Sequence, residues 1–153
     1  MAKSIFNTQD FNPIISRIKS LEPDASKKWG KMNINQMVCH LADQLRMALG
    51  TIEYRDKSTF FSRTVIKFLA VHIINAPPEK VQTLHELDQK RGGTEPLEFE
   101  NDKEVLLAML NEIFALPKDF NYQAHGMFGP MTRNQWGKLI YKHLDHHLRQ
   151  FSS

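Results

Sequence analysis

Twenty residues near the C-terminus, 132–151, constrain the fold more than any other part of the chain. They read TRNQWGKLIYKHLDHHLRQF from Thr132 to Phe151, and their apolar residues recur every three to four positions, as on one side of an α-helix. Thr132 and Gln135 form a capping box that predicts where this helix begins. His143 and His147 fall on the apolar stripe one turn apart. Two imidazoles are therefore expected to face the protein interior.

Inward-facing imidazoles need partners, because an unpaired polar group costs roughly 1–3 kcal/mol when it is sealed from water. One interpretation is that both are core histidines that hydrogen-bond to backbone or carboxylate groups, as isolated HxxxH pairs commonly do. The other is that both bind one divalent cation, because neutral imidazoles four positions apart on a helix present two nitrogens to a single point. Two imidazoles do not complete such a site, so the choice depends on a third ligand.

A second amphipathic run supplies a third candidate. Asn33 opens a capping box, Gly50 marks the expected left-handed end, and His40 lies on the apolar side between them. If this helix and the last one are antiparallel, His40 stands about 10 Å from the start of its helix and level with His143 and His147, roughly 6–12 Å before the end of theirs. This agreement favours a metal site over a pair of core histidines.

Length and composition indicate a single domain, 1–153, that is soluble and cytoplasmic. The one cysteine, Cys39, excludes an internal disulfide and is expected to be a small buried residue rather than a nucleophile. The net charge of +3 is spread along the chain, which gives nucleic-acid binding no support. No apolar leader is present at the N-terminus, and no apolar run approaches the roughly 20 residues that span a bilayer, so no membrane partner is expected.

Two further amphipathic runs predict the remaining long helices. Asp10 is expected to cap the first, and Asn101 or Asp102 to cap the third, which ends before Pro117. The short link after the first helix contains Trp29, which is expected to cover one end of the core rather than to contact a ligand. Such a short link makes the first two helices antiparallel, whereas the long connection that follows leaves enough chain for the second and third to run parallel.

That long connection contains an additional apolar run. Ser58 is expected to start a helix, either packed or interfacial, that ends at Pro77-Pro78, and residues 76–100 have a loop-like composition. Loops of this length are uncommon in compact domains. Four amphipathic helices with an extra one between the second and third predict an all-α bundle.

Three stretches of the chain together resemble the DinB-like (YfiT-like) metalloenzyme superfamily, and specifically one of its subfamilies of unknown function. They are WGKMNINQMVCHLAD (29–43), HGMFGPMT before the last helix, and QWGKLIYKHLDHHLRQF (135–151). The resemblance implies an up-down-down-up four-helix bundle, often a homodimer, with a metal bound by His40, His143 and His147. The chain departs from the family pattern at Gly126, after His125, where we expect a proline.

Three neutral imidazoles leave at least one coordination position open, as in catalytic rather than structural metal sites. Nitrogen ligands suit Zn, Ni, Cu or Fe, and we expect a divalent Zn or Ni ion. Because relatives in the superfamily use low-molecular-weight thiols, the resemblance implies S-transfer from a small thiol to an electrophile. His146 and Gln150 flank the ligand pair and are either polar neighbours on the side of the bundle or catalytic groups that orient an imidazole or contact substrate. His125 is either a surface residue or a group on the substrate side.

Two other functions fit the same residues. A metal could merely staple the helices of a non-catalytic binding or dimerisation module. Metal-dependent hydrolysis is the second, and it needs a general base near the metal. Asp43, three positions after His40, is the acid considered for this role, because Asp145 lies on the water-facing side of the last helix.

Overall fold

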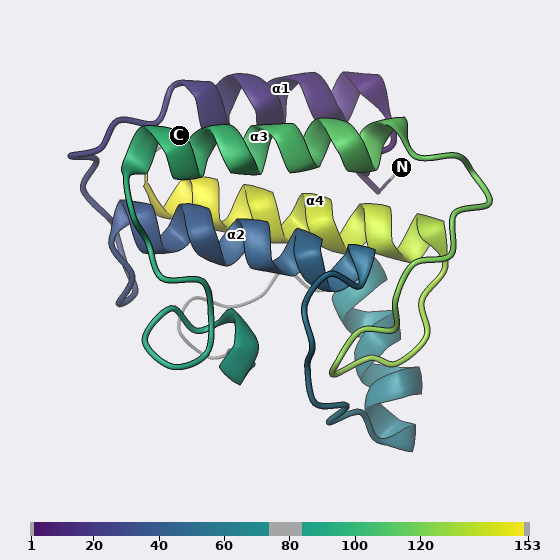
Figure 1. Ribbon diagram of the computed structural model, residues 1–153. Helices are drawn as coiled ribbons and strands as arrows, with labels where there is room; N and C mark the ends of the chain where they lie inside the picture. Colours follow the sequence, from purple (N-terminus) through teal and green to yellow (C-terminus); the bar gives the residue numbers. More distant parts are fainter. Residues whose placement is uncertain (1, 74–83, 152–153) are drawn as a thin grey trace.

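The computed structural model describes residues 2–73 and 84–151 (Figure 1). Within these ranges the chain contains helices and no strand. The long helices are α1 (Thr8–Lys19), α2 (Ile34–Leu49), α3 (Phe99–Ala115) and α4 (Arg133–Gln150). The predicted all-α class is confirmed.

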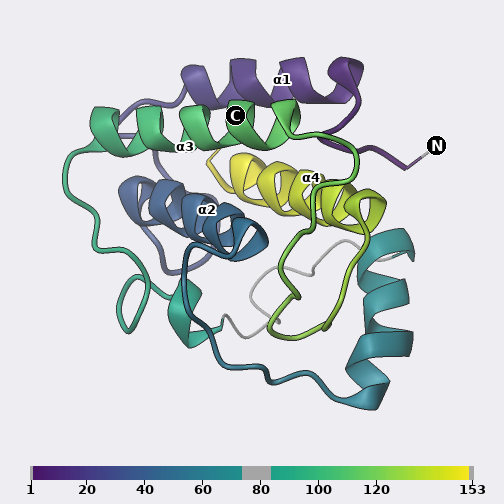
Figure 2. The same cartoon turned by 45° about the vertical axis from the view of Figure 1, so that its right-hand side comes forward.

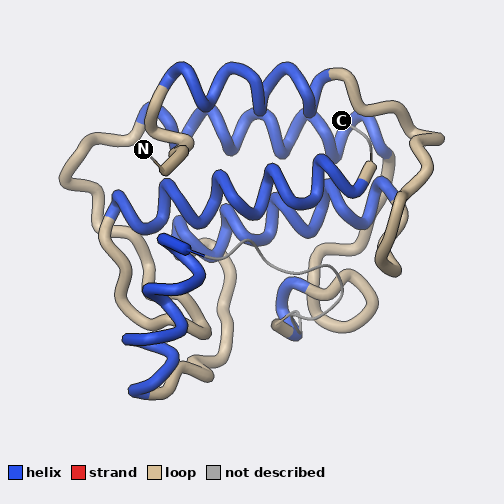
Figure 3. Tube along the Cα trace, turned by 180° about the vertical axis from the view of Figure 1, so that it is seen from behind, coloured by secondary structure: helices blue, strands red, loops and turns tan. Residues whose placement is uncertain are grey.

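The four long helices form two layers. α1 and α3 lie side by side over α2 and α4, and the same arrangement is seen from behind (Figures 1 and 3). Each helix contacts its neighbour in the same layer and one helix of the other layer. The apolar faces meet in one core, in which Ile14, Leu41, Leu110 and Ile140, one from each helix, are almost fully buried.

Local sequence signals set both ends of α2 and the start of α4. The predicted capping boxes are confirmed, since Asn33 with Gln36 and Thr132 with Gln135 each exchange both hydrogen bonds. Gly50 ends α2 with a φ of 75°, the left-handed conformation that glycine adopts without strain. The two helices that carry the candidate ligands are therefore defined by their own residues.

Two of the predicted caps are wrong by one turn or less. α1 is capped by Asn7 rather than Asp10, and α3 by Glu98 rather than Asn101 or Asp102. Both caps accept hydrogen bonds from backbone N–H groups of the first turn. The first residue of α3 is buried in the core, so the helix begins before the polar pair that sequence favours.

The additional helix in the long connection extends from residue 60 to 73 and includes two π-helical stretches, Ser62–Ile66 and Leu69–Ile73. Figure 2 shows it standing away from the four long helices. Lys142 of α4 holds it by donating a hydrogen bond to the carbonyl of Ala70 at 3.0 Å. The predicted end at Pro77-Pro78 lies outside the described residues. Of the helices in the described ranges, none has both the length and the apolar character that crossing a membrane requires.

The second described part of the connection, residues 84–98, folds against α2. It contains one turn of 3₁₀-helix, His85–Leu87, that contacts α2, and is otherwise irregular, as its composition predicts. Residues 76–83 of the predicted loop lie outside the described part. This contact brings the backbone of the connection to the centre of the α2 surface.

Candidate metal centre

Three histidines from two helices meet inside the protein. His40 projects from α2, His143 and His147 project from α4, and one ring nitrogen of each lies within 4.8 Å of the others. The Nε2 atoms of His40 and His143 are 2.8 Å apart. The structure thus brings together the three histidines that helical spacing singles out.

Hydrophobic packing of the two helices produces this meeting. On α4, Trp136 and Ile140 precede His143 on the same stripe and are fully buried. On α2, Met37 and Leu41 flank His40 and are fully buried as well. Because α2 and α4 pack with these stripes facing each other, the imidazoles that replace apolar residues are carried inward to the same level.

Each imidazole is oriented through its second nitrogen by an oxygen acceptor. The Nδ1–H group of His40 donates to the Leu87 carbonyl at 2.7 Å. That of His143 donates to Gln44 Oε1 at 2.8 Å, and that of His147 to Gln150 Oε1 at 2.9 Å. An oxygen that only accepts favours the tautomer with the proton on Nδ1, in which Nε2 is unprotonated. Metal-binding histidines in proteins are commonly oriented in this way.

Gln150 is itself held in a fixed orientation. Its Nε2 donates to the backbone carbonyl of Trp29 at 2.6 Å, so its oxygen faces His147. The adjacent Gly30 has a φ of 84°, and a Cβ at that position would lie 2.2 Å from the Gln150 amide nitrogen. A side chain at position 30 would therefore strain the backbone and displace the Gln150 amide. Gln150 lies where a residue that orients an imidazole is expected.

Burial keeps the three imidazoles neutral. It lowers the pKa of His147 to about 3, lowers the pKa of His143 well below its usual value and lowers that of His40, because the imidazolium form loses hydration. The neighbouring rings lower the pKa values further by like-charge repulsion. At neutral pH three neutral imidazoles therefore converge, with the Nε2 atoms of His40 and His143 at a hydrogen-bonding distance of 2.8 Å, and a cation that replaces the proton between them would be stabilised by the same nitrogens.

This donor set fits a metal ion. The ring nitrogens lie within 4.8 Å of one another, slightly beyond the maximum of about 4.2 Å between two ligands with zinc–imidazole bonds of about 2.0–2.1 Å, so a small side-chain rotation would complete the site. Three neutral nitrogen ligands without a thiolate or carboxylate suit Zn, Ni, Cu or Fe rather than Mg or Ca. The three histidines could therefore bind one transition-metal ion.

Two of the orienting groups are absent from the sequence-based prediction. Gln44 lies four positions after His40 on the same face of α2, so the helical spacing does contain a signal for it. Leu87 contributes only a backbone carbonyl from the long connection. No side-chain pattern marks such a group, and only the path of the folded chain reveals it.

Asp43 holds the connection in place instead of facing the three histidines as a free base. Its carboxylate is 1% exposed and accepts hydrogen bonds of 2.6–2.8 Å from Arg46, from Gln89 and from both the backbone N–H and the hydroxyl of Thr94. Gln89 and Thr94 belong to the loop that carries Leu87. The Asp43 carboxylate therefore fixes the segment whose carbonyl orients His40.

His146 lies beside the three ligands. Its ring centroid is 4.9 Å from that of His147 and 6.0 Å from the Trp29 ring. It is half-buried and lines a small cavity of about 80 Å³ together with Gln44, Leu139, Lys142 and His143. A role for His146 in orienting a ligand or contacting substrate stays a prediction.

Cys39 and two further histidines, His72 and His85, do not belong to the converging group. Cys39 is buried, and burial raises the pKa of its thiol to about 12, as expected for a core residue rather than a nucleophile. His72 is exposed and stacks on Phe68 with centroids 5.1 Å apart. His85 is exposed at the start of the 3₁₀ turn.

His125 closes the turn before α4. Its Nδ1 accepts backbone N–H groups from Met127 at 3.1 Å and Phe128 at 3.3 Å, its ring stacks on Phe128, and its backbone pairs with Gly129. It lies outside the group of three converging histidines. A substrate-side role for His125 stays a prediction.

Protonation of His125 is expected to destabilise the protein. Burial lowers its pKa from 6.5 to about 4, so the unfolded chain binds this proton first, and stability is lost as the pH falls from about 6.5 to about 4. The full effect is roughly 3 kcal/mol. His125→Asn keeps an acceptor for the turn and does not titrate. In urea unfolding of metal-free protein at pH 7 and pH 4.5, we expect its loss of stability to be smaller than that of the wild type, and an equal loss would contradict this.

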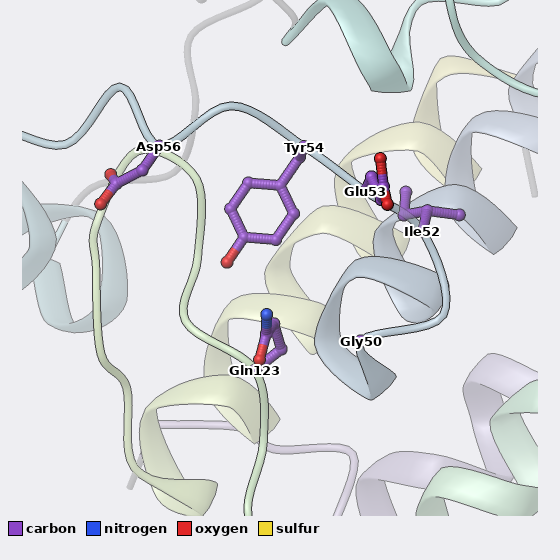
Figure 4. Close-up of a pocket in the computed structure, with 6 residues that line it drawn as sticks. All are labelled: Gly50, Ile52, Glu53, Tyr54, Asp56 and Gln123. Carbon is purple, nitrogen blue, oxygen red and sulfur yellow. The ribbon is translucent and has the colours of Figure 1, made fainter.

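A larger hollow lies away from the three histidines. It has a volume of about 390 Å³, begins where α2 ends, and is lined by Gly50, Ile52, Glu53, Tyr54, Asp56 and Gln123 (Figure 4). Tyr54 and Gln123 face each other across it, and the Tyr54 hydroxyl donates to the Ala124 carbonyl.

Across residues 2–73 and 84–151, His40, His143 and His147 form the one group of metal-ligating side chains that converges. They are therefore the candidate functional site.

The sequence matches one family over nearly its whole length. No curated protein and no solved structure matches it significantly. The model of a family described as "Protein of unknown function (DUF1569)" matches residues 2–153. The chain therefore belongs to the DUF1569 family of proteins of unknown function.

Proposed function

We propose that this protein is a metal-dependent enzyme that transfers a low-molecular-weight thiol to an electrophile. His40, His143 and His147 hold a divalent ion, Zn or Ni, and leave one coordination position for the thiol. The observation that carries this proposal is the convergence of one ring nitrogen from each of three neutral imidazoles, each ring held through its Nδ1. A purely structural zinc site uses four protein ligands, whereas three histidines are typical of catalytic ones.

The proposal also places the chain in the DinB-like superfamily as an up-down-down-up four-helix bundle. The two layers of long helices and the contacts within and between them support this topology. We further expect a cytoplasmic homodimer whose partners are a small thiol and an electrophile, with no nucleic acid or membrane involved. These expectations rest on the sequence resemblance.

The residues of the chain supply binding, orientation and neutrality. When bound, the metal acts as a Lewis acid that lowers the pKa of a thiol, so that sulfur is presented as thiolate. The three imidazoles donate as neutral ligands because burial suppresses their protonation. The oxygen acceptors on the three Nδ1 atoms keep each lone pair directed at the same point. In the transfer, the sulfur forms a bond to the electrophilic carbon, the leaving group departs with its electron pair, and the thiol proton goes to solvent.

Thiol conjugation by metal-loaded protein tests the proposal. Zn- or Ni-loaded protein is incubated with 2-mercaptoethanol or cysteine and an activated aryl chloride, and thioether formation is followed by absorbance. We expect a rate above the uncatalysed reaction that disappears with a chelator and in His143→Gln. The exposed His72→Gln is the matched control and should retain the rate.

A metal staple without catalysis gives a different result. In that case, metal raises the unfolding midpoint of the wild type and not of His143→Gln, while no thiol accelerates the reaction in either protein. Bound metal with a rate equal to the uncatalysed one would therefore overturn the enzymatic proposal. Hydrolysis receives less support, since the two acids nearest in sequence to the proposed ligands are both engaged. Asp43 accepts hydrogen bonds from the neighbouring loop and Arg46, and Asp145 pairs with Arg17 and Arg149.

A further inference from the structure

A small cavity adjoins the metal centre. It has a volume of about 80 Å³ and is lined by Gln44, Leu139, Lys142, His143 and His146. Its wall thus includes the ligand His143, the Gln44 amide that orients His143, and His146, which is adjacent to the ligand His147. A molecule in the cavity therefore lies next to the three histidines.

The cavity is also on the accessible side of the site. His143 is half-buried, whereas His40 is 3% and His147 9% exposed. Of the three ligands, only His143 lines the cavity. A molecule that reaches the metal from solvent is therefore expected to approach past His143.

The charge of the cavity wall is positive. Lys142 is the only ionised residue among the five that line the cavity at neutral pH, and none of the five is acidic. Its ammonium donates to the Ala70 carbonyl at 3.0 Å, which places the charge between α4 and the additional helix. Asp145, the acid nearest in sequence, is engaged by Arg17 at 2.7 Å and Arg149 at 2.9 Å. An anionic group in the cavity therefore meets an attractive field.

We propose that this cavity selects thiols that carry a carboxylate two or three carbons from sulfur, with Lys142 attracting the carboxylate while the sulfur lies at the metal. This inference rests on the proposed function. It depends on the positive charge of Lys142 and not on a vacant hydrogen-bonding position. The volume of about 80 Å³ has room for a group of a few heavy atoms, and Leu139 offers an apolar contact for its methylene groups.

Binding of three short thiols to Co²⁺-loaded protein tests the inference. The probes are 3-mercaptopropionate, 2-mercaptoethanol and cysteamine, which are negative, neutral and positive, and thiolate-to-cobalt charge-transfer absorption gives each Kd. The thiols differ in their own acidity, so their Kd values are not compared directly. The measured quantity is the ratio of the Kd of 2-mercaptoethanol to the Kd of 3-mercaptopropionate, and this ratio in each variant is compared with that in the wild type. We expect Lys142→Met to reduce the preference for 3-mercaptopropionate over 2-mercaptoethanol roughly 10- to 100-fold.

Two variants of the same helix serve as controls. Lys142→Arg retains the charge and should retain the preference, which also shows that replacing this side chain does not disrupt the fold. Lys138→Met removes a lysine one turn earlier that does not line the cavity, and should change the ratio by less than about threefold.

The outcomes separate the two proposals. If the three thiols bind but the ratio is the same in the wild type and Lys142→Met, the inference is overturned and the proposed thiol chemistry stands. If cobalt binds and no thiol produces the charge-transfer band, the proposed function fails, and the inference fails with it. A ratio that falls equally in Lys142→Met and Lys138→Met would show a general field effect and would also overturn the assignment to the cavity.

Discussion

His143→Gln is expected to weaken Zn²⁺ binding by more than about 100-fold, because the loss of a residue that only orients a metal-binding histidine already commonly costs 10- to 100-fold. The substitution leaves two imidazoles, which do not make a stable site for a transition metal. The same result is expected for His40→Gln, since both residues place Nε2 at the same point. Competition with a chromophoric chelator at pH 7.5 measures the affinities, and wild-type protein should bind one ion per chain.

The matched control is His72→Gln. This histidine is exposed on the additional helix and stacks on Phe68, so its removal should leave the affinity unchanged. If His143→Gln bound zinc as tightly as the wild type, the three histidines would be ordinary core residues. The hydrogen bonds from their Nδ1 atoms would then serve packing alone.

The second large effect is expected at Asp43. Asp43→Asn replaces one carboxylate oxygen by an amide that donates, so at least one of the donors from Gln89 and Thr94 loses its acceptor. Breaking a buried charged network of this kind costs about 3 kcal/mol. Because the same loop carries the carbonyl that orients His40, we also expect zinc affinity to fall roughly tenfold or more. Urea unfolding and the chelator competition measure the two effects.

Asp145→Asn provides the comparison on the other helix. Its side chain is 26% exposed and bridges Arg17 and Arg149. We expect a loss of at most about 1 kcal/mol, as is typical of exposed ion pairs, with unchanged zinc affinity. If Asp43→Asn lowered stability without lowering zinc affinity, the loop would not be what keeps His40 in its orientation.

The sequence predicts the ligands because all three lie on regular helices. Helical spacing determines which side of α2 and α4 faces inward, and a rise of about 1.5 Å per residue places His40 level with His143 and His147. The capping boxes at Asn33 and Thr132 then fix where the count begins. Besides these local rules, the level match requires only that the two helices run antiparallel.

The remaining features depend on the path of the folded chain. The sequence offers more than one possible N-cap for α1 and for α3. Asn7 and Asp10 lie within one turn of each other, and Glu98 precedes two other polar residues. Burial of Phe99 in the core makes Glu98 the cap of α3. The approach of Leu87 to His40 joins residues that are 47 positions apart, and such a contact leaves no periodic trace in the sequence.

The span of the chain between the ligands bears on when a metal can act during folding. His40 and His143 are 103 positions apart, so the coordination sphere exists only after nearly the whole chain has closed on itself. A cation that recognises this late-formed geometry shifts the equilibrium towards the native state, by about 2.7 kcal/mol at a free concentration of 100 times its Kd. If the contacts between these histidines form only after the transition state, the cation slows unfolding and does not accelerate folding. Metal availability would then govern the lifetime of the native molecule rather than the speed of its formation.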